Sequence, residues 1–135
     1  MTQIQNSERK WYILDFDGKT YGRELTRVAN LLMGKGKTNY APNLDQGDYV
    51  VIVNAAKAVF TGRKLDQKTY YKHTGYLGNL KQMDLKTMLD KKPIDLIKKS
   101  VAGMLPKNKL QDDRLARLKV YTDAVHPHQN VKFEE

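Results

Sequence analysis

A nearly continuous run of β-branched residues, YVVIVNA at positions 49–55, constrains the fold more than any other feature of this chain. Such runs are typical of strands that are covered on both faces, as in a parallel sheet. A second apolar and aromatic run, WYILDF, occupies residues 11–16. Between the two, residues 20–33 carry apolar side chains at helical spacing, and Gly34 stands where a helix C-terminal glycine belongs. Strand, helix and strand in this order predict a βαβ unit with a right-handed crossover.

The rest of the chain predicts further short elements around this unit. Residues 34–48 are rich in glycine, proline and polar side chains and predict an irregular loop, whereas 58–62 and 119–121 predict short strands. Three helices are expected from their apolar periodicity: 84–90, the stretch from Pro93 to Pro106, and 111–118. We therefore predict an α/β protein with one domain. Its parts are an N-terminal extension over residues 1–10, the α/β domain over 11–121 and a C-terminal surface tail over 122–135.

Basic residues are concentrated in one part of the chain. Of the 24 lysines and arginines, sixteen lie within residues 57–119, which hold only six acidic residues, so this segment carries a formal charge of +10 and the remainder −1. A polyanionic partner explains this concentration better than solubility does, because each neutralised phosphate releases counterions and adds affinity. Tyrosines lie among these lysines, and no long amphipathic basic helix is evident, which favours nucleic acid over a membrane surface.

Composition limits the remaining classes of function. The 135 residues include no cysteine, which excludes disulfides and cysteine-based metal or redox sites. The N-terminus, MTQIQNSERK, lacks the apolar run of a signal peptide, and no apolar stretch approaches the roughly 18 residues of a membrane span. We expect a cytoplasmic protein that has no membrane partner.

One turn supports an alternative hypothesis, in which the protein is an enzyme. Gly18-Lys19-Thr20 lies between the first strand and the first helix, where a phosphate-binding P-loop would lie. The position five residues before Gly18 is Ile13, however, and not the glycine that the full motif needs. A small phosphate-handling α/β enzyme that uses this turn is therefore the alternative hypothesis. We favour a tight turn in which Thr20 caps the helix.

Other candidate catalytic or metal-binding groups have structural interpretations. The chain has two serines, neither within a Gly-x-Ser-x-Gly turn, which argues against a serine triad. His126 and His128 offer two imidazoles, but no adjacent cysteine or acid completes a metal site. Asp45 and Asp48 are candidates for metal binding or acid–base chemistry, although hydrogen bonding within a turn before the second strand is favoured. We expect no cofactor, no metal, no small-molecule substrate and no enzymatic activity.

Three segments predicted as loops combine glycine or proline with basic or aromatic residues: 34–40, 70–81 and 104–109. Glycine lets the backbone approach phosphates closely, lysine supplies charge, and aromatic rings stack on unpaired bases. No RRM, KH or helix-turn-helix signature is present. The three segments together predict binding to folded RNA that is recognised through its shape and backbone.

At these residues the chain resembles a known family, the bacterial-type large-ribosomal-subunit protein thirteen. The resemblance extends from Trp11 to about His128 and rests on short motifs in a fixed order. They are Trp11-Tyr12, Gly18-Lys19-Thr20 with Gly22-Arg23, Gly34-Lys35 with Lys37, Tyr40 and Pro42, Gly47-Asp48-Tyr49, Asn54-Ala55, Thr61-Gly62, Tyr70-Tyr71 with His73-Thr74-Gly75, Gly103-Met104-Leu105-Pro106-Lys107, and Leu118-Lys119-Val120-Tyr121. Each motif alone is weak, whereas the ordered set is specific.

The resemblance implies a three-layer α/β/α domain around a mostly parallel four-stranded sheet. It also implies a structural constituent of the large ribosomal subunit, bound to large-subunit ribosomal RNA and neighbouring ribosomal proteins and associated with early subunit assembly. Some members of the family are linked to messenger RNA binding and translational repression. The candidate RNA-binding residues are Lys35, Lys37, Tyr40, Arg63, Lys64, Lys68, Tyr71, Lys72, His73, Thr74, Lys81, Lys107, Lys109, Arg114, Arg117 and Lys119.

Overall fold

The βαβ unit predicted from the N-terminal half is present. The structure is a computed structural model that describes residues 9–38, 40–78, 80–129 and 131–134, so most of the predicted N-terminal extension lies outside the described residues. The unit comprises β1 (Trp11–Asp15), α1 (Tyr21–Met33) and β2 (Tyr49–Val53), and its strands pair in parallel. Helix α1 ends at Gly34, whose φ of 79° lies in the left-handed region that favours glycine.

Short helices and strands make up the rest of the chain. The helices are η1 (Ala55–Lys57), α2 (Lys64–Gln67), α3 (Leu85–Lys91), α4 (Pro93–Met104) and α5 (Leu110–Ala116). The strands are β3 (Thr69–His73), β4 (Leu80–Asp84), β5 (Leu118–Val120) and β6 (Phe133–Glu134). The predictions of α3, α4, α5 and β5 are confirmed, with boundaries moved by one or two residues. The strand predicted at 58–62 is reduced to one bridge, between Thr20 and Val59.

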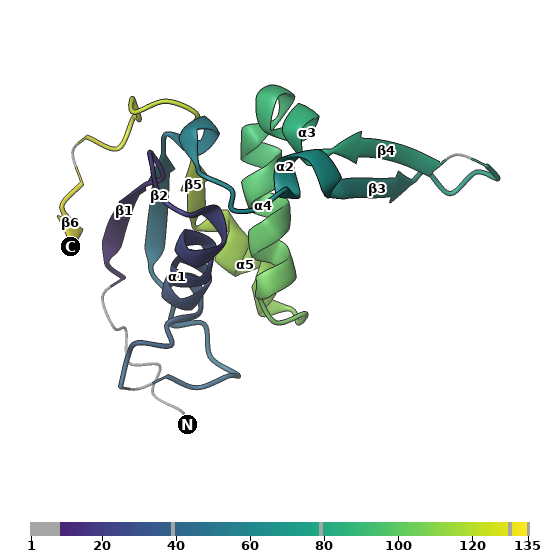
Figure 1. Cartoon of the computed structure of the whole chain (residues 1–135). Helices are drawn as coiled ribbons and strands as arrows, with labels where there is room; N and C mark the ends of the chain where they lie inside the picture. The colour runs from purple at the N-terminus through teal and green to yellow at the C-terminus, as the bar shows by residue number, and fades with distance from the viewer. Residues whose placement is uncertain (1–8, 39, 79, 130, 135) are drawn as a thin grey trace.

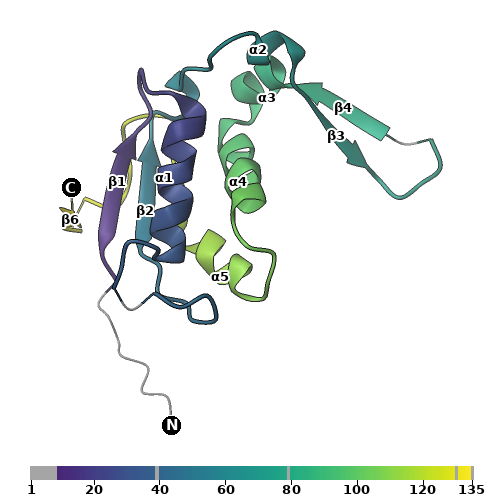
Figure 2. The same cartoon turned by 60° about the horizontal axis from the view of Figure 1, so that its bottom comes forward.

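Helices cover one face of the larger sheet. Its strand order is β5-β2-β1-β6, and all three pairings are parallel. The connections from β1 to β2 and from β2 to β5 step across the sheet in the same direction, so right-handed crossovers bring α1 and α4 to the same face. Figures 1 and 2 show this arrangement. Val50 and Ile52 of β2 belong to the core between the sheet and these helices.

The C-terminal residues lie on the other face. Val51 alternates with the core residues of β2 and is nonetheless fully buried. The Trp11 and Tyr49 rings, which share this side of the sheet, stack with centroids 4.3 Å apart, and the His128 ring lies 5.3 Å from Trp11. The Tyr121 hydroxyl is 2.8 Å from Nε2 of His128. These contacts place an irregular segment, rather than a helix, against this face.

The α/β class predicted from the sequence is therefore confirmed. Three strands form the parallel centre of the sheet, and β6 adds only two residues to its edge. Within the described residues, helices pack on one face of this sheet and not on both (Figure 2). Of the segment predicted as a surface tail, residues 122–135, His128 and β6 contact the sheet.

A hairpin projects from this body where the sequence predicted a loop. Strands β3 and β4 pair in antiparallel fashion, and Figures 1 and 2 show them extending away from the helices. The turn-prone residues of this stretch are confined to the connection, where Gly75 and Gly78 have φ values of 92° and 76°. Tyr70, Tyr71, Lys72 and Lys81 are therefore strand residues. We call residues 69–84 the hairpin arm.

Candidate nucleic-acid interface

The hairpin arm presents cations and apolar side chains to solvent. Lys72 lies directly opposite Lys81 in the antiparallel register. The described residues provide neither lysine with a carboxylate within 4 Å, and the arm's one acidic residue, Asp84, lies at its base, opposite Thr69. Like charges directly opposite each other destabilise a sheet. The arm therefore carries an electrostatic cost in the free protein that a bound anion would remove.

Exposed rings and aliphatic side chains accompany these lysines. The side chains of Tyr71, Tyr76 and Leu80 are 57%, 73% and 51% exposed, and Leu77 at the turn is fully exposed. His73 accepts a hydrogen bond from the Gly75 N–H through Nδ1, at 3.0 Å. An arm whose outer residues are cationic and aromatic suits contact with phosphates and unpaired bases.

The predicted residues do not form a single surface. Arg63, Lys64 and Lys68 are exposed where the arm joins the body. Lys35 lies in the connection between α1 and β2, whereas Lys107 and Lys109 lie in the connection between α4 and α5. Figures 1 and 2 show both connections at the end of the body opposite the arm. Two separate basic regions result, one at each end.

Three further candidates are engaged within the protein. Nζ of Lys37 is 2.9 Å from Oδ1 of Asp48. Tyr40 is half-buried in the same connection. Lys119 donates a hydrogen bond from Nζ to the Ala116 carbonyl at 3.0 Å. Lys37 thus helps to hold the α1–β2 connection, and Lys119 contacts the end of α5.

Two candidates, Arg114 and Arg117, lie in the interior and are 1% and 6% exposed. Arg117 donates from Nη1 and Nη2 to the two carboxylate oxygens of Asp45, at 2.7 and 2.6 Å, and from Nη2 to the Leu32 carbonyl at 3.1 Å. These bonds fasten the α1–β2 connection to the end of α5. We accordingly correct the prediction that both arginines contact RNA, because each is enclosed by its own chain.

Close packing around this pair also explains Gly47. A Cβ atom at this position would collide with the Leu32 carbonyl and would lie 2.7 Å from Nη2 of Arg117. Arg9 donates from Nη1 to the Gly47 carbonyl at 2.6 Å. Asp45 and Asp48 thus have structural partners, as the favoured sequence interpretation held. No group of three potential metal ligands occurs in the described part of the chain.

Acid should weaken the fold in part through Asp45. Burial raises the pKa of this carboxyl, but the hydrogen bonds and charge of Arg117, with the charges of Arg9 and Arg114, outweigh burial and lower the pKa overall. A group whose pKa is lower in the folded state stabilises the fold above its unfolded-state pKa, and this contribution is lost as pH falls through the folded-state pKa.

We therefore expect the wild-type protein to lose more stability than Asp45→Asn as the pH falls from about 5. Urea unfolding at a series of pH values measures this difference. The variant should already be less stable at neutral pH, since its amide cannot pair with Arg117 as a carboxylate does. If the wild-type protein and the variant lost the same amount of stability as the pH falls, the role given to Asp45 would be contradicted.

The Gly18-Lys19-Thr20 turn, on which the enzyme alternative rests, is hydrogen-bonded to the backbone of Val59. Gly18 has a φ of 71°, the Lys19 N–H donates to the Phe16 carbonyl, and the Val59 N–H donates to the Lys19 carbonyl. Thr20 occupies the N-cap position, but its side chain makes no capping hydrogen bond, so that part of the sequence interpretation is wrong. The turn thus has a structural role in holding the segment before α2.

Sequence analysis missed two cations near the base of the arm. Arg23 of α1 and Lys99 of α4 are exposed, and Nζ of Lys99 lies 4.9 Å from the centroid of the Tyr70 ring. Both residues lie in helices, whereas most of the predicted RNA contacts lie in segments predicted as loops. The signal available was their position on the solvent-facing side of amphipathic helices.

A basic α/β domain with a cationic and aromatic hairpin has the properties of a nucleic-acid-binding protein. Residues 9–127 match the family model described as Ribosomal protein L13. The chain is 53% identical to large ribosomal subunit protein uL13 of Thermotoga petrophila over 134 residues, which cover 99% of this chain and 90% of that protein. It is also 54% identical to uL13 of Syntrophotalea carbinolica and 51% identical to that of Clostridioides difficile, over 90% of this chain and 85% of each relative.

The chain belongs to the ribosomal protein L13 family. This assignment confirms the resemblance identified in the sequence. Because the relatives are named as ribosomal proteins, it also supports the interpretation of the chain as a protein without enzymatic activity. None of the helices that the structure describes is long and apolar enough to cross a membrane.

Proposed function

We propose that this protein is a structural component of the large ribosomal subunit and binds large-subunit ribosomal RNA mainly through its hairpin arm. Neighbouring ribosomal proteins are further expected partners, and early subunit assembly is the expected process. The family membership and the names of the relatives support the setting. The proposed contacts are Tyr71, Lys72, His73, Thr74 and Lys81 in the arm, together with Arg63, Lys64 and Lys68 where the arm joins the body.

The observation that carries the proposal is the opposed pair Lys72 and Lys81. A hairpin that only had to fold would gain from a carboxylate at one of these positions, since opposite charges stabilise cross-strand pairs. Two lysines instead concentrate positive charge on a narrow arm. Phosphates of an RNA backbone would neutralise both and release counterions.

The exposed side chains at the end of the arm support the same partner. Tyr76 and Leu77 expose apolar surface to water in the free protein, which is unfavourable. Both lie next to strands that carry lysines. A structured RNA offers unstacked bases that aromatic side chains can cover. The basic residues at the opposite end of the body, Lys35, Lys107 and Lys109, are proposed as a second and smaller RNA contact.

Binding to large-subunit ribosomal RNA as a function of salt tests this proposal. With about four phosphate contacts, affinity should fall roughly a hundredfold as monovalent salt rises from about 50 to 200 mM. The pure full-length chain should be titrated into a large-subunit RNA fragment by filter binding, with a duplex of mixed sequence as the competitor. Absence of binding, or binding that salt does not weaken, would refute the proposal.

The same surface would also accept other folded RNAs, because backbone contacts do not read sequence. No described residue distinguishes messenger RNA from ribosomal RNA. We therefore make no separate proposal for messenger RNA or for translational repression.

A further inference from the structure

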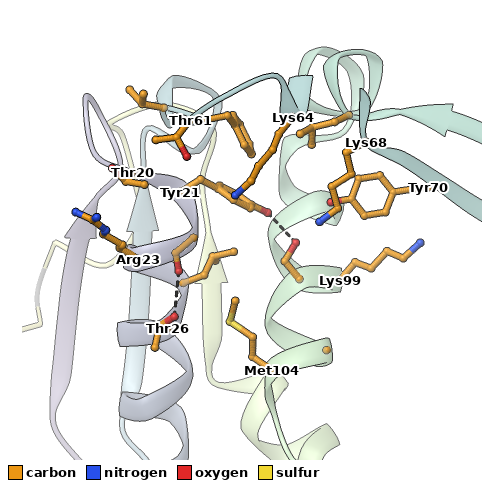
Figure 3. A pocket seen from close by; sticks show the side chains of 17 residues that line it. Thr20, Tyr21, Arg23, Thr26, Thr61, Lys64, Lys68, Tyr70, Lys99 and Met104 are labelled. Atoms are coloured by element: carbon orange, nitrogen blue, oxygen red, sulfur yellow. Dashed lines mark hydrogen bonds between the residues drawn. The ribbon is translucent and has the colours of Figure 1, made fainter. Parts of the chain in front are cut away.

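A cavity of about 640 Å³ opens at the base of the hairpin arm. It lies between the first half of α1 and α4, with the segment 59–61 and α2 above them, and Tyr70 of β3 closes one side (Figure 3). Its floor is braced by the Tyr21 hydroxyl, which is 2.8 Å from Oγ of Ser100. The volume falls within the range of sites that bind small organic ligands, roughly 300–1,000 Å³.

The charged side chains that line the cavity are all cationic. They are Arg23, Lys64, Lys68 and Lys99. The described residues place no carboxylate within 4 Å of any of them, and no acidic residue lines the cavity. The ammonium groups of Lys68 and Lys99 lie 5.3 and 4.9 Å from the centroid of the same ring, that of Tyr70. Both ammonium groups would attract an anion bound next to this ring.

Aromatic and apolar surfaces form the remaining wall. The Tyr21 and Phe60 rings lie with centroids 4.5 Å apart, and Leu85 and Met104 add aliphatic surface. The hydroxyl-bearing residues Thr20 and Thr61 complete the rim. A site for a bare phosphate would not need this apolar wall. A site for an apolar ligand would not need four cations without carboxylate partners. A nucleotide has both an anionic and a planar apolar part.

We propose that this cavity binds one unpaired nucleotide of the RNA that the protein contacts. The phosphate lies beside Lys64 and Lys68, with Lys99 adding positive charge next to the Tyr70 ring, and the base packs against Phe60 and Tyr70. The inference rests on the proposed RNA-binding function and adds to it that the RNA must present an extruded nucleotide. The position of the cavity supports this, because an RNA that lies along the arm passes its base (Figures 1 and 3).

The neighbouring cavity at the other end of α1 is a weaker candidate. It has a volume of about 550 Å³ and shares Arg23 with the first, but it also contains Asp48. That carboxylate already pairs with Lys37. An anion there would have to compete with a charge that the fold itself supplies, so the inference concerns only the cavity at the base of the arm.

The first test uses adenosine 5′-monophosphate with the full-length chain, followed by NMR titration. Chemical-shift changes should concentrate at the cavity, with adenosine and inorganic phosphate binding more weakly because each lacks one part of the ligand. Lys68→Gln/Lys99→Gln should weaken AMP binding at least about tenfold, as expected when charge-assisted contacts are lost. Lys91→Gln/Lys92→Gln removes the same charge outside the cavity and should leave it unchanged.

The second test distinguishes an RNA nucleotide from a free one. The wild-type chain should bind a hairpin RNA with a single-nucleotide bulge more tightly than its fully paired counterpart. Lys68→Gln/Lys99→Gln should lose this preference while it retains salt-dependent binding to both RNAs. Thermal unfolding verifies that the variant is folded.

Two results would overturn the inference. One is an AMP affinity that the cavity variant does not change. The other is an equal affinity of the wild-type chain for bulged and paired RNA; if AMP were nevertheless bound, the cavity would be a site for a free nucleotide. Failure of the broader proposal is distinct, because neither RNA would then bind.

Discussion

Arg117→Met is expected to lower the free energy of unfolding by about 3 kcal/mol. The substitution leaves the Asp45 carboxylate without its bidentate partner and the Leu32 carbonyl without a donor. Removing one partner of a buried ion pair commonly costs about 3–5 kcal/mol, and the lower end applies here because the Asp45 side chain remains 19% exposed. Urea unfolding at neutral pH measures the change.

Arg63→Met provides the matched control. Arg63 is exposed at the start of α2 and belongs to the proposed RNA surface, so its replacement should change stability by no more than about 0.5 kcal/mol. Its RNA affinity should fall, whereas Arg117→Met should keep its affinity under conditions where it is folded. A stable Arg117→Met protein with impaired RNA binding would show that the structural role assigned to Arg117 is wrong.

Lys72→Gln/Lys81→Gln is expected to weaken binding to large-subunit ribosomal RNA by roughly a hundredfold at low salt. Two charge-assisted phosphate contacts would be lost, each worth about 1.5 kcal/mol, and about 1.4 kcal/mol corresponds to a factor of ten. The salt dependence should also become shallower, by about 0.7–0.9 in logarithmic slope for each contact. Titrations at several salt concentrations give both quantities.

The same variant should be slightly more stable than the wild-type protein in the absence of RNA. Neutral residues at positions 72 and 81 remove the repulsion between two lysines that face each other, a gain of a few tenths of a kcal/mol. Lys57→Gln/Lys132→Gln has the same change in net charge outside the arm and should affect RNA binding much less. If both double variants lost the same affinity, total charge rather than the arm would determine binding.

Local signals in the sequence were sufficient for most of the body. The β-branched run of β2, the apolar spacing of α1 and the glycine that ends it each act over a few residues, so they predict their elements without knowledge of the rest. The direction in which successive strands are added then decides which face the helices cover. That direction is not encoded in any single stretch, and the three-layer expectation therefore failed to predict that irregular backbone occupies the second face.

The candidate site was harder to predict because it depends on distant pairings. Pairing of residues 69–73 with 80–84 converts a glycine-bearing loop into an arm, and only that register places Lys72 against Lys81. The number of lysines and arginines in a segment likewise does not show which of them are exposed and which are buried. Arg117 belongs to the interior because Asp45, 72 residues away in sequence, meets it there.

Chemical modification of lysines in the complex with large-subunit ribosomal RNA tests the central claim most directly. The protein should be acetylated at low reagent concentration, free and RNA-bound, and the rate at each lysine determined by mass spectrometry. Lys72 and Lys81 are expected to react readily in the free protein and to be strongly protected in the complex, whereas Lys57 and Lys132 should react alike in both. Equal reactivity of Lys72 and Lys81 in the free and bound states would contradict the assignment of the hairpin arm as the main RNA contact.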